Sequence, residues 1–127
     1  MLALPILLAA SLACHAIDGD TMRCGKDRIR LLGIDAPEMP GHCRKGRICA
    51  SGDAQASWNS LGRAMRAGPL RIVSITRDRY GRIVGVVHAG SVNLSCVQLS
   101  RGMAIYVKKW DNGGRIREAC HAGKMER

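Results

Sequence analysis

The sequence predicts an α+β fold that is mainly β, in which a five-stranded barrel packs against two to three helices. Three observations carry this prediction. The 127 residues suffice for one domain with a real core and are too few for two. Short stretches of alternating or β-branched residues are separated by turn residues. Stretches with helical spacing interrupt them, so the few strands must curve to bury a common face.

The first thirteen residues predict a signal peptide. Residues 1–13 carry no charged side chain and are apolar, but they are too short to cross a bilayer as a helix. Ser11-Leu12-Ala13 fits the small-x-small pattern for cleavage before Cys14. Lipid anchoring at Cys14 is a disfavoured alternative, because Ser11 stands where a lipoprotein signal usually has Leu. In a second alternative the segment is not cleaved, and residues 7–16 form the first strand of the domain. We expect an exported protein, periplasmic or extracellular, with one domain over 14–127 that ends in a short basic tail.

A β-hairpin and a strand are predicted first. Ile17-Asp18-Gly19-Asp20-Thr21 places a turn dipeptide between strand-compatible residues. Residues 28–34 begin with charged and apolar side chains in alternation and then become wholly apolar, as in a strand with one polar face. Pro37 has no N–H to donate, so it ends this strand. Asp35 and Glu38 are therefore expected at the strand end and in the following loop.

The rest of the chain alternates helix and strand signals. Residues 39–52 predict a loop, after which Ser51 or Asp53 can cap a helix that Gly68-Pro69 ends. The predicted apolar stripe of this helix comprises Ala54, Trp58, Leu61 and Met65. The later predicted elements are strands over 70–75 and 83–88 around a polar turn at 77–82, a short helix that Asn93 caps and Gly102 closes, a strand over 103–107 and a weak basic helix from Arg115.

Six cysteines in a small exported chain favour disulfides over free thiols. They are Cys14, Cys24, Cys43, Cys49, Cys96 and Cys120. The alternative is a metal site, built either from His42, Cys43 and Cys49 or from Cys120 and His121. Neither set has the paired CxxC spacing of a structural zinc site, so zinc ranks below disulfides.

Sequence geometry narrows the fifteen pairings that six cysteines allow. Cys14 and Cys24 are equidistant from Gly19, so a hairpin that turns there would bring them face to face. Cys43 and Cys49 bracket a basic loop and would close it. The remaining two cysteines would then pair with each other.

The charge of the chain points to a polyanionic partner. Twenty Lys and Arg against ten Asp and Glu give a formal net charge of +10 and a pI near 10.0. Such a surface speeds encounter with phosphates and gains from counterion release, although an anionic membrane or cell wall would satisfy it as well. Phe is absent, so the core must be aliphatic. Few residues can stack on bases, namely Trp58, Trp110, Tyr80 and Tyr106.

Three acids, Asp20, Asp35 and Glu38, and two arginines stand at special positions. Asp20 and Asp35 are hard oxygen ligands of the kind that Ca²⁺ prefers, and a curved sheet could bring their separate segments together. Taken singly, each is better explained as a turn or loop residue than as a metal ligand. Arg30 projects from the polar face of its strand, and Arg82 follows a Tyr-Gly turn. A planar guanidinium suits two phosphate oxygens at once, although most basic side chains are solvated surface.

Four stretches of the chain carry a family resemblance. They are Ile17-Asp18-Gly19-Asp20-Thr21, Arg30-Leu31-Leu32-Gly33-Ile34-Asp35-Ala36-Pro37-Glu38, Asp78-Arg79-Tyr80-Gly81-Arg82 and Gly102-Met103-Ala104. In order and spacing they resemble the successive signatures of the thermonuclease family, the staphylococcal-nuclease-like proteins. The resemblance covers residues 17–106. It implies an oligonucleotide-binding (OB) barrel with helices at one side and a Ca²⁺-dependent phosphodiesterase site.

The resemblance also implies roles for individual residues. Asp20 and Asp35 match the carboxylates that bind Ca²⁺, and Ala36 falls where the family contributes a backbone carbonyl. Glu38 matches the residue that orients or deprotonates the attacking water. Arg30 and Arg82 match the two arginines that clamp the scissile phosphate, so with Glu38 they are the expected catalytic residues. Tyr80 matches a residue near another phosphate, and Arg79 lies beside it; both are expected to bind substrate.

The sequence departs from the family pattern near both ends. Cleavage before Cys14 would leave a shorter first strand than the family usually has. After the last strand the family often has a base-stacking aromatic pair, and here Trp110 is the nearest match, either as a base platform or as a packed tail residue. The loop HCRKGRIC, residues 42–49, follows Glu38 directly. A disulfide there would hold the loop near Glu38, and Arg44, Lys45 and Arg47 could meet neighbouring phosphates or remain solvated.

These observations together predict a secreted Ca²⁺-dependent nuclease that hydrolyses phosphodiester bonds of DNA and RNA with little sequence specificity. Single strands are favoured because an OB surface admits splayed bases. The alternative is a non-catalytic module of OB type that binds single-stranded nucleic acid. A basic protein acting on membranes or cell walls ranks last, since the only basic helix has a poor apolar face. No stable protein partner is implied, and we expect a monomer.

Overall fold

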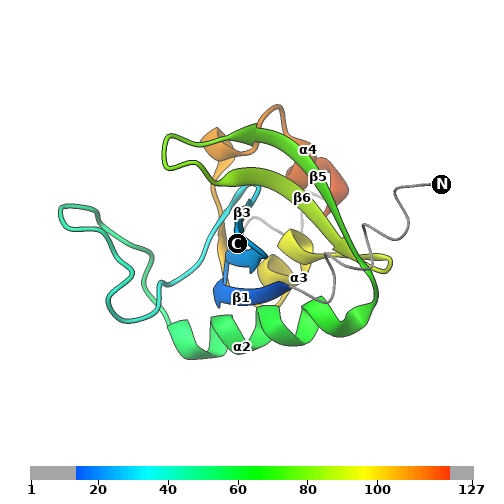
Figure 1. Cartoon of the computed structure of the whole chain (residues 1–127). Coiled ribbons are helices and arrows are strands. Elements are labelled where there is room, and N and C mark those ends of the chain that lie inside the picture. The colour runs from blue at the N-terminus through cyan, green and yellow to red at the C-terminus, as the bar shows by residue number, and fades with distance from the viewer. Residues whose placement is uncertain (1–13, 121–127) are drawn as a thin grey trace.

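The computed structural model describes residues 14–120, which form a curled mixed sheet with helices around it (Figure 1). The strand order is β1-β2-β3-β6-β5, antiparallel except for the parallel pair β3–β6. Their bounds are β1 Cys14–Asp18, β2 Thr21–Cys24, β3 Asp27–Leu31, β5 Leu70–Arg77 and β6 Ile83–Ala89, with β7 (Val92–Asn93) paired to β6. The predicted α+β fold of OB type is confirmed.

The strand expected over residues 28–34 is divided in two. Gly33 has φ +79°, a left-handed conformation that interrupts the extended backbone between β3 and the next strand. That strand, β4 (Ile34–Asp35), leaves the main sheet and pairs antiparallel with β8 (Ile105–Tyr106), the core of the strand expected over 103–107. The break turns Asp35 out of the main sheet while β3 stays in it.

The long helix α2 (Ala54–Ala64) begins and ends where the sequence predicts. The side chain of Asp53 accepts a hydrogen bond from the N–H of Ala56 at 2.9 Å, and a 3₁₀ turn, η1 (Met65–Ala67), leads to Gly68. Its buried face differs from the expected stripe and comprises Ser57, Ser60, Leu61 and Ala64. The two serines are buried because they have hydrogen-bonding partners inside the protein, whereas Trp58 lies at the edge and donates its indole N–H to the carbonyl of Ala16 at 2.8 Å.

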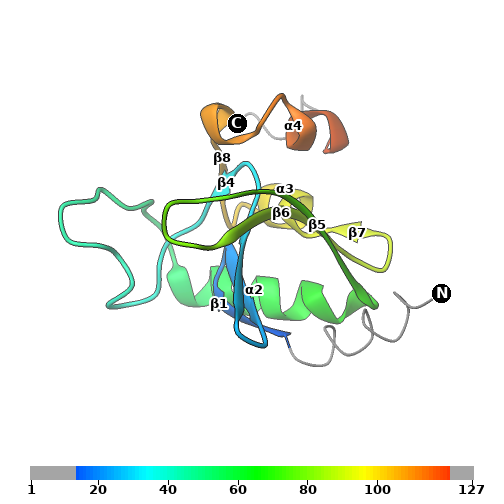
Figure 2. The same ribbon diagram turned by 45° about the horizontal axis from the view of Figure 1, so that its top comes forward.

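Two shorter helices complete the structure. Asn93 caps α3 (Leu94–Ser100), as predicted, and α4 (Arg115–Ala119) follows the 3₁₀ turn η2 (Lys108–Trp110). Figures 1 and 2 show α2 and α4 at opposite sides of the molecule. The core between them is aliphatic, as the absence of Phe requires. Its fully buried large apolar side chains are Met22, Ile29, Leu31, Leu32, Ile34, Leu61, Leu94, Ile116 and Val87.

The six cysteines form three disulfides, which confirms the pairing expected from the sequence. The bonds are Cys14–Cys24, Cys43–Cys49 and Cys96–Cys120. Cys14 and Cys24 are direct cross-strand partners in the first hairpin. No free cysteine exists within residues 14–120, so no thiolate is available as a zinc ligand there and both zinc alternatives are wrong. His121, named in one of them, lies outside the described residues.

Two expectations concern segments that the structure does not describe. The signal peptide over residues 1–13 and the basic tail after residue 120 lie outside the described residues. Within the described part, no helix has the length and apolar character needed to span a membrane.

Candidate functional site

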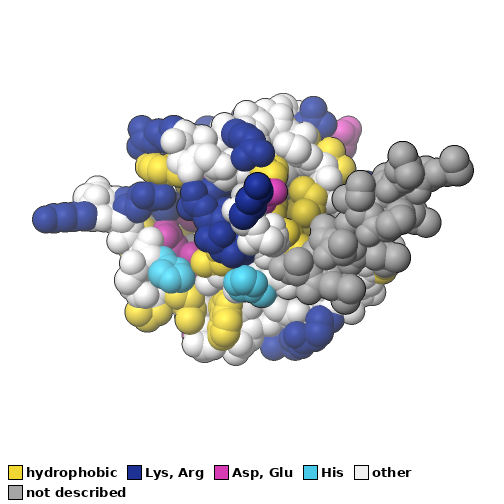
Figure 3. Space-filling view, in the orientation of Figure 1, with side chains coloured by type: hydrophobic (Ala, Val, Ile, Leu, Met, Phe, Trp, Pro, Cys, Tyr) yellow, Lys and Arg dark blue, Asp and Glu magenta, His cyan; other side chains and the backbone are white. Residues whose placement is uncertain are grey.

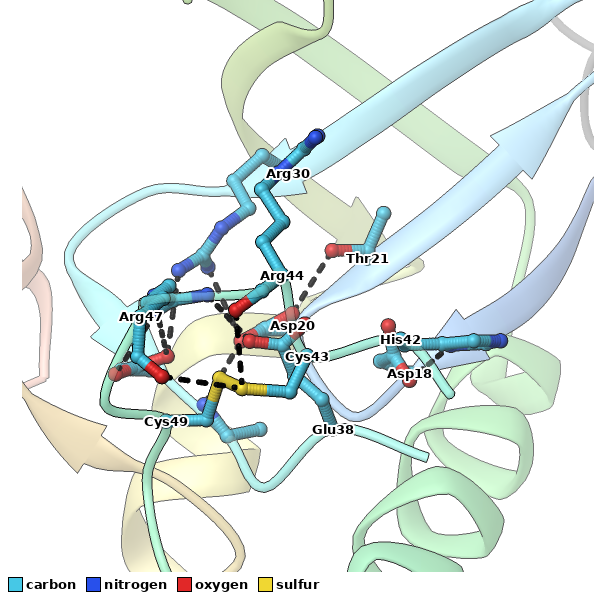
Figure 4. Close-up of polar contacts among 12 residues, drawn as sticks. Asp18, Asp20, Thr21, Arg30, Glu38, His42, Cys43, Arg44, Arg47 and Cys49 are labelled. Atoms are coloured by element: carbon cyan, nitrogen blue, oxygen red, sulfur yellow. Dashed lines mark hydrogen bonds and ion pairs between the residues drawn. A yellow bond between two sulfur atoms is a disulfide. The ribbon is translucent and has the colours of Figure 1, made fainter. Parts of the chain in front are cut away.

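The three acids that the sequence singles out lie close enough to influence one another's charge. Figure 4 shows two of them, Asp20 and Glu38, with Arg30 and Arg47. Asp20 lies in the β1–β2 turn, Asp35 ends β4, and Glu38 follows it in the next loop. Asp20 and Asp35 are only 3% and 8% exposed, and the side chain of Glu38 is 11% exposed. Burial of several carboxylates near one another is costly unless cations compensate them.

Arg30 joins two of these acids. Its Nη1 lies 3.3 Å from Asp20 Oδ2 and its Nη2 lies 3.5 Å from Asp35 Oδ1. Arg30 is 9% exposed and also donates to the carbonyl of Ile34 at 2.9 Å. It is the cross-strand partner of Thr21, which follows Asp20, so the register of the β2–β3 hairpin brings the guanidinium to the acids.

The Asp20 turn is fixed by contacts that connect it to both α2 and α3. The carboxylate of Asp20 accepts hydrogen bonds from the N–H of Ala36 and the hydroxyl of Thr21, each at 2.8 Å. Gly19 packs so closely on α2 that a Cβ there would lie 1.7 Å from Ser57 Oγ. The fully buried Gln98 of α3 donates to the carbonyl of Gly19 at 2.7 Å. No role in the site was predicted for Gln98, because its partners come from distant segments.

Arg47 contacts the acids, whereas the sequence predicted that it would meet neighbouring phosphates or remain solvated. Its Nη2 lies 3.2 Å from Asp35 Oδ1 and 3.4 Å from Oδ2, and its Nη1 forms an ion pair with Glu38. Arg47 belongs to the disulfide-closed loop of residues 43–49, and it points back into the acid cluster (Figure 4). No local signal distinguishes it from the neighbouring Arg44 and Lys45.

The pKa values in the cluster indicate incomplete charge compensation. Burial raises the pKa of Asp35, and the nearby Asp20 carboxylate raises it further, against the lowering effect of Arg30 and Arg47. Burial also raises the pKa of Glu38, with Arg47 opposing it and the other acids adding to it. Three carboxylates face two guanidinia, so the cluster carries an excess of negative charge. Its hard oxygen donors fit a divalent cation such as Ca²⁺.

The loop after Glu38 is held by a further acid. Asp18 Oδ1 accepts a hydrogen bond from the N–H of Met39 at 2.8 Å and lies 2.8 Å from Nδ1 of His42. The sequence presented Asp18 as a turn former. In the structure it also anchors the start of the loop that carries Arg47.

The β5–β6 turn forms a second, self-contained cluster. Nε of Arg82 donates to Asp78 Oδ2 at 2.7 Å, and Asp78 Oδ1 accepts from the N–H groups of Tyr80 and Arg82. Burial alone would raise the pKa of Asp78, but these hydrogen bonds and the Arg82 charge outweigh it and lower the pKa. Arg82, the expected partner of Arg30, is thus paired with a local acid.

Tyr80 connects this turn to two other segments. The guanidinium carbon of Arg44 lies 3.6 Å from the centroid of the Tyr80 ring. The guanidinium of Arg28 donates to the backbone carbonyl of Tyr80 at 2.6 Å. Arg79 donates to the hydroxyl at 3.0 Å, and this hydrogen bond lowers the pKa of the Tyr80 phenol. The loop of residues 43–49 therefore reaches the β5–β6 turn through Arg44.

Members of both clusters line one cleft of about 930 Å³. Glu38, Arg30 and Arg47 lie in it together with Tyr80 and Arg82 of the turn. Figure 3 shows acidic side chains surrounded by lysines and arginines on one face of the molecule. This arrangement concentrates positive charge around a small acidic centre, as a site for a polyanion with a bound cation requires.

Trp110 closes one side of the cleft. It lies in η2, is 37% exposed, and its ring centroid is 5.2 Å from the guanidinium carbon of Arg30. The segment is held by Asp111, which is fully buried and accepts hydrogen bonds from the hydroxyl of Tyr106 and the N–H groups of Ile116 and Arg117. The indole is therefore in the cleft and available to a ligand.

Comparison with known proteins agrees with this geometry. The family model described as staphylococcal nuclease homologue matches residues 28–125, more than half of the chain. The chain is 26% identical over 120 residues to "Staphylococcal-like nuclease CAN1" of Arabidopsis thaliana, covering 86% of this chain and 33% of that protein. It is 37% identical over 82 residues to "Succinoglycan biosynthesis protein ExoI" of Rhizobium meliloti (strain 1021), covering 64% of this chain and 41% of that protein. The chain thus corresponds to less than half the length of either relative, and it belongs to the family of staphylococcal nuclease homologues.

Proposed function

We propose that this protein is an exported, Ca²⁺-dependent nuclease that hydrolyses DNA and RNA with little sequence specificity and favours single strands. The observation that carries the proposal is the convergence of Asp20, Asp35 and Glu38 around Arg30, beside the basic cleft that Arg30 and Glu38 line. Three disulfides fit an oxidising, exported environment. The family relationship supports a nucleic-acid substrate.

The proposed chemistry divides among the residues of the acid cluster. A phosphodiester is anionic and resists attack by water, so the site must neutralise it and position a water molecule. Asp20, Asp35 and the backbone carbonyl of Ala36 would hold Ca²⁺, which supplies charge neutralisation at the phosphate when bound. Glu38 orients the attacking water and accepts its proton.

The basic and aromatic residues hold the substrate in this proposal. Arg30 donates from the strand to the oxygens of the scissile phosphate, and Arg82 does so from the turn once it leaves Asp78. Arg79 and Tyr80, which line the same cleft, would hold a neighbouring phosphate. Trp110 offers a face for one base, which a single strand can present without unpairing.

The proposal is tested with the exported protein on single-stranded DNA, single-stranded RNA and duplex DNA. We expect cleavage of all three with Ca²⁺, fastest on the single strands, and no cleavage after chelation. Asp35→Asn should abolish the Ca²⁺ response while binding of DNA persists. Binding with and without Ca²⁺, but cleavage in neither, would instead identify a non-catalytic nucleic-acid-binding module. The mass of the exported protein, unreduced and reduced, tests cleavage before Cys14 and any lipid.

A further inference from the structure

The contacts of Arg47 place a cation of the protein itself on the acids proposed to serve Ca²⁺. Both carboxylate oxygens of Asp35 lie within 3.4 Å of Arg47 Nη2. The other terminal nitrogen, Nη1, donates to Glu38 Oε2. A single guanidinium thus bridges the proposed metal ligand and the proposed water-binding residue.

Both oxygens of Asp20 and Oδ1 of Asp35 have further partners within the protein. Asp35 Oδ1 also lies 3.5 Å from Nη2 of Arg30. Asp20 Oδ2 accepts from the N–H of Ala36, and its Oδ1 accepts from Thr21. A Ca²⁺ ion needs direct contact with carboxylate oxygens at about 2.3–2.6 Å. On Asp35 it would meet oxygens that a guanidinium of like charge already occupies.

The loop presents Arg47 in a constrained way. The disulfide Cys43–Cys49 closes the segment that carries it, and the N–H of Arg47 donates to the carbonyl of Arg44 at 3.0 Å. One end of the loop is fastened by the contact of His42 with Asp18 at 2.8 Å. Arg44 rests on the Tyr80 ring at 3.6 Å. Arg47 is therefore held against the acids by several independent contacts of its loop.

We propose that Arg47 is a built-in competitor of Ca²⁺, so that the metal binds only when Arg47 leaves Asp35 and Glu38. The inference rests on the proposed function, which identifies the metal as Ca²⁺. It adds that the disulfide-closed loop of residues 43–49 lowers the Ca²⁺ affinity of the site through Arg47. The disulfide Cys43–Cys49 contributes by holding Arg47 against the acids. Arg47 is thus a residue that controls access of the cation.

The chain offers a matched control for this competition. Lys45 belongs to the same disulfide-closed loop and carries the same charge, but it is exposed, and no contact between it and an acid is found among the described residues. Its removal lowers the net charge as much as removal of Arg47 does. A difference between the two variants therefore measures the local contact.

The test is titration calorimetry of the exported protein with Ca²⁺ alone, without nucleic acid. We expect Arg47→Met to tighten Ca²⁺ binding by about tenfold, the effect of losing one charge-assisted interaction with the ligands. Lys45→Met should stay within about twofold of the unaltered protein, because exposed charges are screened. The double variant Cys43→Ser, Cys49→Ser should tighten binding by an intermediate factor, because Arg47 is then held less firmly.

The outcomes separate this inference from the proposed function. Unchanged or weaker Ca²⁺ binding by a folded Arg47→Met variant, with normal binding by the unaltered protein, overturns the competition and leaves the nuclease intact. Equal tightening by Lys45→Met overturns it as well, because the effect would then be one of net charge. Failure of the unaltered protein and of Arg47→Met to bind Ca²⁺ overturns both proposals.

Discussion

The two arginines expected to act on one phosphate have opposite surroundings in the structure. Arg30 is buried on β3, and its charge is compensated by Asp20 and Asp35, which come from different segments. Arg82 lies beside the β5–β6 turn, partly exposed, and its charge is compensated by Asp78 four residues earlier. The first cluster exists only when the fold brings its parts together. The second is formed by local hydrogen bonds.

This difference has consequences for function and for stability. The charges around Arg30 are fixed in place before any ligand arrives, which is the condition for strong electrostatic stabilisation of a reacting group. Arg82 must leave Asp78 before it can bind a phosphate. The free energy lost with that ion pair offsets part of the stabilisation that Arg82 gives to the bound phosphate. Variants of the two clusters should therefore differ in size of effect.

The largest effect is expected for Arg30→Met. Hydrolysis of single-stranded DNA should fall by about 10³-fold, as for the loss of one preorganised donor. The free energy of unfolding should fall by about 3 kcal/mol, because two buried carboxylates lose a partner. Rate assays with Ca²⁺ and urea denaturation measure the two losses. Arg30→Lys should keep a larger share of the free energy of unfolding than of the hydrolysis rate. A near-normal hydrolysis rate for Arg30→Met would contradict the assignment of Arg30 to the active site.

Next in size is Glu38→Gln, for which rate and stability should change in opposite directions. We expect a rate loss of about 10²-fold or more, as for removal of a general base. Because the pKa of Glu38 is raised in the folded protein, its ionised form costs stability at pH above its unfolded pKa. The variant should be the more stable protein at pH 7, and this advantage should vanish at low pH, where Glu38 is protonated in both states. Urea denaturation across pH measures it; lower stability at pH 7 would contradict the prediction.

A smaller rate effect is expected for Arg82→Ala, about tenfold, because its guanidinium starts from a partner inside the protein. The same rate assay on single-stranded DNA measures it. Asp78→Asn is the matched variant, since it releases Arg82 without removing it. A loss as large as that of Arg30→Met would mean that the turn rearranges on the substrate, and the contrast between the clusters would then fail.

The smallest effect is expected on stability from Asp78→Asn, about 1 kcal/mol or less, because the pair is partly solvated. The lowered pKa of Asp78 means that its stabilisation is present above the unfolded pKa and is lost as pH falls through the folded pKa. Thermal unfolding should therefore separate variant and parent at pH 7 and bring them together at strongly acidic pH. A constant difference across this range would show that hydrogen-bond geometry, and not charge, is responsible.

Much of the fold was predictable because its signals are local. The first hairpin, the cap of α2 at Asp53 and the cap of α3 at Asn93 follow from turn and capping chemistry. The disulfide between Cys14 and Cys24 follows from the symmetry of the hairpin. Such features depend on residues that are close in sequence.

What the sequence missed depends on distant partners. Ser57 and Ser60 look unsuited to a core until distant acceptors are considered: the Ser60 hydroxyl donates to the side chain of Gln98, and the Ser57 hydroxyl donates to the carbonyl of Met103. Arg47 looks like any loop cation, because the acids that attract it are positioned by the sheet. The pairing of Arg82 with Asp78 was within reach, since their spacing of four residues is visible in the sequence. The roles of Ala36, Arg79 and Trp110 remain predictions.

The buried amide of Gln98 also bears on how the molecule moves. Gln98 connects the carbonyl of Gly19 to α2 and α3, and the N–H of Leu31 donates to the carbonyl of Asp20 at 2.8 Å. Amide hydrogens around this turn should exchange with solvent only when the whole domain unfolds. Residues 39–52 are outside helices and strands, so their amides should exchange through brief local openings. The segments that carry Asp20 and Asp35 should therefore stay closed for as long as the core stays folded. The segment that carries Arg47, whose guanidinium covers Asp35, should open far more often.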